Sequence, residues 1–136
     1  MGKGASPVVD VGAYERQPWV NVGLGLSAYG AEWWLLPQLA FTAGFETRLA
    51  LTHAVPFGIG VLVVGSVNGN YPIKGGILVP EPQFAQMFAN DAQGGAIFAG
   101  VLPADAVVGA SVYFQVWGPV DGAWSATNAL MGTVEL

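Results

Sequence analysis

The sequence contains no cysteine. Disulfide bonds, thiolate nucleophiles, cysteine-ligated zinc and iron–sulfur clusters are therefore excluded. A single domain of 136 residues can bury enough apolar surface to fold without cross-links. The missing thiols exclude several kinds of chemistry, but they do not fix the cellular compartment.

Charge is also scarce. Only 10% of the residues are Asp, Glu, Lys or Arg, against about 25% in a typical soluble domain. Four of these residues are basic and the net charge is −5, which excludes nucleic acid as a partner because phosphate backbones are bound by lysine and arginine. So few ionised groups leave apolar or amide surface exposed, and a large apolar patch usually marks a contact surface.

The sequence has no uninterrupted apolar run long enough to span a membrane. Its longest stretch without a charged residue, Leu49–Ile73, is broken by Pro56 and several glycines. The densest apolar part covers about 13 residues, against about 20 for a spanning helix, so we predict a buried strand there and no membrane span. Residues 1–7 lack the apolar segment of a signal peptide, so an exported form would carry its export signal outside this chain.

Helical patterns are rare and strand patterns are common. The best helical candidate is Pro82–Phe88, where the proline favours one helical turn. Elsewhere 20 glycines and nine prolines separate short runs of alternating apolar residues, which is typical of short strands joined by turns. The expected strands are 19–26, 47–52, 59–64, 96–102, 111–117 and 128–136, and the expected turns are 68–70, 74–76, 91–95 and 119–122.

This pattern predicts an all-β fold, an antiparallel β-sandwich of roughly seven to eight short strands, Ig-like or jelly-roll-like. We expect the sandwich to span residues 18–136, with residues 1–17 as a linker or a terminal strand. The apolar run 59–64 is expected to be a central strand covered on both faces, which places Val63 in the core. Phe114 is expected to be a second core residue, and Gly75 or Gly76 is expected to adopt a positive φ.

The order of the motifs from Trp19 onward resembles a known family. The motifs are Trp19–Leu26, Pro37–Leu39, Arg48–Leu51, Val61–Gly65, Tyr71–Pro80, Asn90–Gly94, Val112–Trp117 and Ser125–Leu130. Together they resemble the C-terminal β-sandwich module of very large exported proteins of planctomycete- and myxobacterial-type bacteria. Pro7–Glu15 resembles the segment that closes parallel β-helix repeat regions in such proteins. The resemblance implies an extracellular or cell-surface location and a structural role beside upstream domains of a parent protein, and it carries over no catalytic residue.

Residues suited to catalysis are few and dispersed. His53 is the only histidine; it continues the strand face of Leu49 and Leu51, and we interpret it as a core or strand-end histidine that makes one hydrogen bond. The nine acids fall mostly in predicted turns or at strand ends, so no carboxylate pair for glycoside hydrolysis is predicted. Asp91 and its turn lack the density of acids found in a calcium loop. We therefore expect no enzymatic activity, no metal and no cofactor.

Aromatic residues are the one feature that suggests a binding site. Trp33 and Trp34 are adjacent, so an extended chain directs one toward the core and the other toward water or a partner. Tyr29 and Tyr71 are expected in neighbouring loops. These four are the candidate binding residues, and three interpretations stay open: packing of the core and loops, a protein interface, or stacking on a glycan.

Three functions are considered on this basis. The leading one is a non-enzymatic structural or surface-display module of an extracellular protein, which docks, caps or anchors. Its partners would be upstream domains of a parent protein or other copies of itself. The first alternative is a carbohydrate-binding module that uses exposed aromatic residues, and the second is a self-assembling subunit of a shell or fibre, favoured by low charge and many strands.

Overall fold

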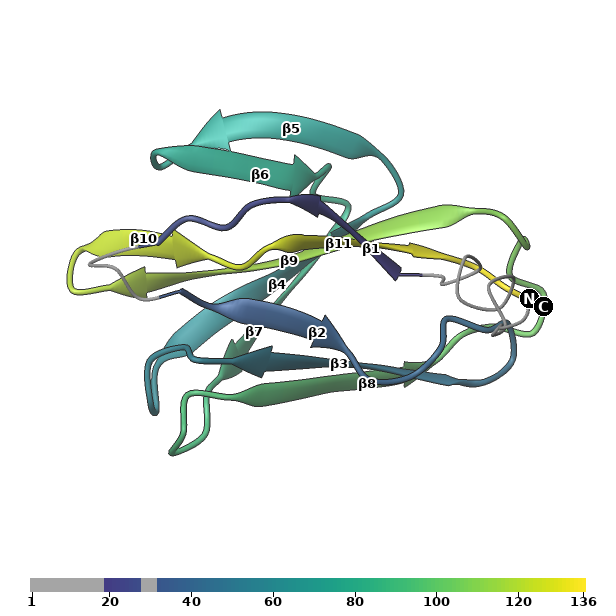
Figure 1. Cartoon of the computed structure of the whole chain (residues 1–136), viewed down its shortest axis with the longest axis horizontal. Helices are drawn as coiled ribbons and strands as arrows, with labels where there is room; N and C mark the ends of the chain where they lie inside the picture. The colour runs from purple at the N-terminus through teal and green to yellow at the C-terminus, as the bar shows by residue number, and fades with distance from the viewer. Residues whose placement is uncertain (1–18, 28–31) are drawn as a thin grey trace, which may run out of the picture.

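The chain forms β-strands arranged in three layers (Figure 1). The computed structural model describes residues 19–27 and 32–136, so the expected linker 1–17 lies outside the described residues. The strands are β1 (Trp19–Gly23), β2 (Trp34–Pro37), β3 (Glu46–Thr52), β4 (Ile59–Gly65), β5 (Asn68–Ile73), β6 (Gly76–Pro80), β7 (Phe84–Ala89), β8 (Ala96–Val101), β9 (Ser111–Val120), β10 (Ala123–Ala126) and β11 (Ala129–Thr133). Antiparallel sheets pack against each other, which confirms the predicted all-β sandwich. No helix in this part of the chain is long and apolar enough to cross a membrane.

The middle layer is a sheet of six strands in the order β1-β11-β9-β4-β7, with β10 paired to the second half of β9. β9 turns into β10 at Asp121 and Gly122, whose φ angles of 47° and 84° suit the type I′ turn that matches the twist of a hairpin. β10 and β11 follow the same edge of β9 and are separated only by Thr127 and Asn128. The two strands are therefore one strand with a short interruption.

A smaller sheet covers each face of the middle layer (Figure 1). On one face lies the sheet β2-β3-β8, and on the other lies the hairpin of β5 and β6. Lys74 and Gly75 connect β5 to β6 with φ angles of 52° and 85°. The predicted turn at 74–76 and the predicted positive φ are therefore both confirmed, and Gly75 is the residue concerned.

Two apolar cores result, one on each face of the middle layer. The first is formed by Trp33, Leu35, Leu49, Leu51, Ala54, Leu62, Val116 and Leu130, and the second by Val63, Leu78, Trp117 and Ala126. β4 contributes Leu62 to the first core and Val63 to the second, because successive side chains of a strand point to opposite faces. This confirms that residues 59–64 form a central strand covered on both faces, with Val63 buried.

Phe114 packs against the first core at one end of the sandwich. Its ring centroid lies 5.7 Å from that of Trp19 and 5.9 Å from that of Phe41. The side chain is half-buried. The predicted facing of Phe114 is therefore correct, although the ring keeps contact with solvent.

Two predictions of local structure are wrong. Pro82–Phe88 forms no helical turn, because residues 84–89 are β7 and pair in register with β4; the hydrogen-bonding edge of β4 outweighs a weak helical propensity. The expected turn at 68–70 belongs to β5, where Asn70 takes a φ of 49° at an irregularity in the pairing with β6. Asparagine tolerates this conformation, so the strand continues past it. The hairpin of β5 and β6, together with β2, accounts for most of the strands beyond the predicted number.

Candidate functional site

The two adjacent tryptophans lie on opposite sides of the chain at the start of β2. Trp33 is 3% exposed and belongs to the first core, whereas Trp34 is 40% exposed. Trp33 packs so closely on Gly118 that a Cβ atom added there would lie 2.6 Å from its Cη2 atom. The prediction that one indole faces the core and the other faces outward is confirmed, and Trp34 is the one available to a ligand.

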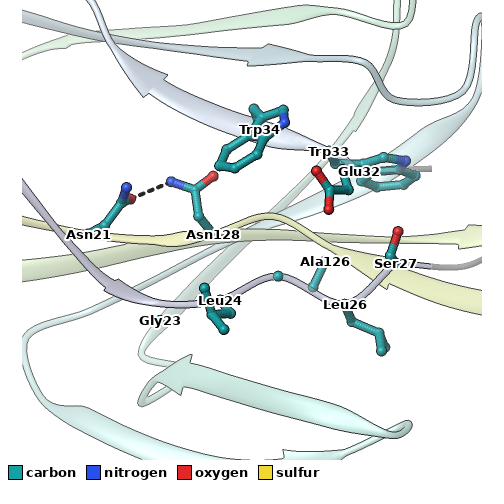
Figure 2. A pocket seen from close by; sticks show the side chains of 11 residues that line it. Asn21, Gly23, Leu24, Leu26, Ser27, Glu32, Trp33, Trp34, Ala126 and Asn128 are labelled. Atoms are coloured by element: carbon teal, nitrogen blue, oxygen red, sulfur yellow. Dashed lines mark hydrogen bonds between the residues drawn. The ribbon is translucent and has the colours of Figure 1, made fainter. Parts of the chain in front are cut away.

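Trp34 lines a cleft of about 340 Å³ between the chain that follows β1 and the chain that leads into β2. Figure 2 shows Trp34 and Glu32 on the β2 side of this cleft and Leu24 and Leu26 on the β1 side. Leu24 is almost fully exposed. The cleft therefore offers an indole face and one carboxylate, whereas the side chain of Leu26 packs against the second core.

The described lining of this cleft is suited to stacking and hydrogen bonding. Glu32 is the only carboxylate among its described lining residues, which include no histidine, lysine or arginine. A glycosidase needs a second carboxyl group at a defined separation. The Nε1 atom of Trp33 is buried and has no hydrogen-bond partner in the described structure. Within residues 19–27 and 32–136, no cluster of three or more His, Asp or Glu side chains is placed to hold a metal ion.

Of the other two candidate residues, Tyr71 is not brought to Trp34. Tyr29 lies outside the described residues. Tyr71 is half-exposed on β5, in the layer on the opposite face of the middle sheet from β2 (Figure 1). The expectation that Tyr71 lies in a loop is wrong, because it pairs with Leu78 in the β5–β6 hairpin.

His53 lies just beyond the end of β3 and takes a φ of 68°. Its Nδ1 atom lies 3.1 Å from the Oγ1 atom of Thr52, and its side chain is exposed. The interpretation as a strand-end histidine with one hydrogen bond is confirmed. The side chain does not continue the buried face of Leu49 and Leu51, because the left-handed backbone ends the alternation of the strand.

Asn128 is a buried polar residue that the sequence analysis missed. Its Oδ1 atom accepts a hydrogen bond of 2.8 Å from the backbone N–H of Leu35, and its Nδ2 atom donates one of 3.0 Å to the carbonyl of Leu35. The same Nδ2 atom donates to Oδ1 of Asn21 at 2.6 Å (Figure 2). The side-chain amide of Asn128 therefore occupies the place of a neighbouring strand at the outer edge of β2.

Gln115 has the equivalent position on the other face of the middle sheet. Its Oε1 atom accepts hydrogen bonds of 3.0 Å from the backbone N–H of Val79 and from Nε1 of Trp117. Its Nε2 atom donates to the carbonyls of Thr127 and Ile77 at 3.1 and 3.3 Å. The amide thereby bonds the backbone of β6. The signal in the sequence is an amide residue inside an otherwise apolar strand, which must find partners when it is buried.

A further exposed feature is the side of the sandwich where β7 and β8 lie together, which we call the β7–β8 side. β7 is an edge of the middle sheet and β8 is an edge of the sheet β2-β3-β8. The rings of Phe88 and Phe98 join the two edges, with centroids 4.8 Å apart. Neither strand contains a charged residue or a proline. The large exposed apolar side chains on these strands are Phe84, Met87, Ile97 and Val101.

Comparison with known proteins gives no match: no family model, no curated protein and no solved structure is significantly similar to this chain. The resemblance to exported β-sandwich modules therefore stays a prediction, and the function is argued from the geometry alone.

Proposed function

We infer that the protein is a non-enzymatic structural module of an extracellular or cell-surface protein, which docks onto, caps or anchors other polypeptide chains. The observation that supports this function is the β7–β8 side, where two uncharged edge strands lie next to each other. An exposed, apolar edge strand presents unpaired backbone groups to which another chain can pair. The partners are upstream domains of a parent protein or other copies of the chain.

Two strands of the outer layers differ from β7 and β8, because buried amide side chains bond their backbones. The outer edge of β2 is bonded by the side chain of Asn128, and the backbone of β6 is bonded by Gln115. Among the described residues no strand pairs with the outer edge of β7 or of β8. Natural edge strands usually carry lysine, proline or a bulge that prevents pairing, and these two strands carry none of them.

Sedimentation velocity across a concentration series tests this function with other copies as the partner. We expect the mass to rise above 14.1 kDa as the concentration increases, because the exposed side chains are apolar. Sodium sulfate should strengthen the association, and sodium chloride should weaken it little because the surface carries few charges to screen. A monomer at every concentration and in both salts would exclude other copies as the partner.

A carbohydrate-binding function is the second candidate, and the cleft at Trp34 favours it. An exposed indole beside a carboxylate suits a sugar ring, which stacks on the one and donates hydrogen bonds to the other. Affinity electrophoresis and a glycan array test it with Trp34→Ala, which should abolish binding and leave unfolding unchanged. Leu36→Ala is the matched control, because Leu36 is exposed on the same strand and does not line the cleft. Equal binding by both variants would exclude the cleft.

A further inference from the structure

We propose that two copies of the chain pair through β7 in an antiparallel arrangement with twofold symmetry about Gln86, so that the middle sheet continues from one molecule into the other. This inference rests on the proposed docking function and names its partner as a second copy.

β7 is the regular edge of the large sheet. Its six residues pair with β4 in continuous register, from Ile59 opposite Ala89 to Val64 opposite Phe84. The opposite edge, β1, has an irregularity between Asn21 and Gly23. In the outer layers, β2 is bonded by Asn128, and β5 contains a proline and the left-handed residue Asn70. A second chain therefore finds the longest uninterrupted edge of the middle sheet at β7.

The backbone of β7 offers alternate residues to a partner. Asn90, which follows β7, donates its N–H to the carbonyl of Gly58 beside β4. Hydrogen-bonded residues alternate along an antiparallel pair. The backbone N–H and C=O groups of Gln86 and Phe88 therefore point toward β4, as those of Asn90 do. Ala85 and Met87 direct their N–H and C=O groups away from β4. A second strand can bond these groups without displacing any existing hydrogen bond.

The side chains of β7 are compatible with their own copies. A twofold axis perpendicular to the sheet keeps each residue on its own face, so Gln86 lies opposite Gln86 of the partner subunit. Phe84 then lies opposite Phe88 of the partner subunit, an aromatic pair of the kind that stabilises sheets. Ala85 lies opposite Met87 of the partner subunit, so a small side chain meets a large one. Self-pairing also requires a strand without charge, since like charges directly opposite each other repel, and β7 has none.

The absence of cysteine makes disulfide trapping a clean test of this register. In the proposed dimer Gln86 and its copy form a non-hydrogen-bonded pair with Cα atoms about 4.5 Å apart, within the range of about 4.4–6.8 Å that a disulfide spans. Mild oxidation of Gln86→Cys should therefore double the mass from 14.1 kDa. Met87→Cys is the matched control on the same strand. Its side chain is 73% exposed, but in the proposed dimer Met87 of the partner subunit lies diagonally across from it, about 7–8 Å away, beyond the reach of a disulfide.

Mixing two variants sharpens the test. Neither Ala85→Cys nor Met87→Cys should cross-link with itself, but an equimolar mixture should form the mixed disulfide, because these residues lie opposite each other. Val20→Cys, on the exposed edge strand β1, controls for random collision. A further variant, Met87→Lys, needs no cysteine and places a charge at the contact. It should therefore shift the sedimenting species from dimer to monomer, while thermal unfolding of the monomer stays unchanged.

The outcomes separate this inference from the proposed function. Cross-linking of Gln86→Cys no faster than that of Met87→Cys or Val20→Cys overturns the pairing, and so does a Met87→Lys variant that associates like the wild type. Cross-linking of Ala99→Cys in place of Gln86→Cys would move the contact to β8 and would also overturn it. In these cases an associating wild-type chain still supports the docking function. A monomeric wild-type chain overturns the pairing and excludes other copies as the docking partner.

Discussion

The side-chain amide of Asn128 hydrogen-bonds both backbone groups of Leu35, a residue 93 positions away in the sequence. One side chain of the middle sheet thus satisfies both backbone groups of one residue on an edge strand of the neighbouring layer. Gln115 bonds β6 on the opposite face in the same manner. The outer layers are therefore attached by buried amides as well as by apolar packing, and this arrangement can be tested by substitution.

Replacing Asn128 with alanine should destabilise the fold by about 2–4 kcal/mol. The substitution leaves the N–H and C=O of Leu35 buried without partners, and each unsatisfied group costs about 1–3 kcal/mol. Urea unfolding measures the loss as a lower midpoint with an unchanged m-value. Asn21→Ala is the control, because it removes only the contact between the two asparagine side chains and should cost about 1 kcal/mol. Equal losses in the two variants would contradict the role assigned to Leu35.

Replacing Gln115 with glutamate should make the stability depend on pH. The new carboxyl group would be buried, with one oxygen near the carbonyls of Ile77 and Thr127. Both burial and these carbonyls favour the protonated form of the new carboxyl group. Its pKa in the folded chain therefore lies above the value of about 4.3 that it has in the unfolded chain. Above that pH the unfolded chain releases the proton and the folded chain retains it, so stability falls as pH rises. Unfolding at pH 4 and pH 7 measures the effect.

Gln115→Met is the matched control for that experiment. It removes every side-chain hydrogen bond of residue 115, including those accepted from Val79 and Trp117 that a glutamate would keep, and it adds no titrating group. Its free energy of unfolding relative to the wild type should be the same at pH 4 and pH 7. If the glutamate variant were equally insensitive to pH, the side chain at position 115 would have access to water.

Replacing Phe114 with alanine should cost about 3 kcal/mol, near the lower end of the values for buried phenylalanine. The ring contacts Trp19 and Phe41 but is only half-buried, so its removal opens a cavity that is partly accessible to solvent. Chemical denaturation measures the loss. Met87→Ala is the control at an exposed position, and a loss no larger than that of the control would contradict the packing of Phe114.

Alanine substitutions at two turn glycines should differ in cost. Gly75 has a φ of +85° and no atom within 4 Å of an added Cβ, so Gly75→Ala carries only backbone strain of about 1 kcal/mol. Gly94 has a φ of +77°, and an added Cβ would lie 1.9 Å from the carbonyl oxygen of Ala54. Gly94→Ala should therefore lower the melting temperature considerably more. Similar melting temperatures for the two variants would mean that the turn at 91–95 shifts freely.

The features that were predictable follow from short-range rules. Alternation along an extended chain was enough to separate Trp33 from Trp34, and a nearly continuous apolar run was enough to place residues 59–64 between two covered faces. Turn chemistry was enough to predict a left-handed residue at Gly75 or Gly76, and the structure identifies it as Gly75. The rules failed where a distant partner decides the outcome: residues 84–89 became a strand because β4 offered them an edge.

The sequence by itself determined the class of fold and the chemistry that is absent, because strand alternation, turn residues and composition act over a few positions. It also determined that apolar surface would remain exposed, since so few side chains are charged. Only the tertiary structure decided which strands became edges and which of those edges were bonded by Asn128 and Gln115. The physical reason is that a buried amide and an edge strand find their partners through long-range packing, and among the described residues that packing leaves the outer edges of β7 and β8 without a paired strand.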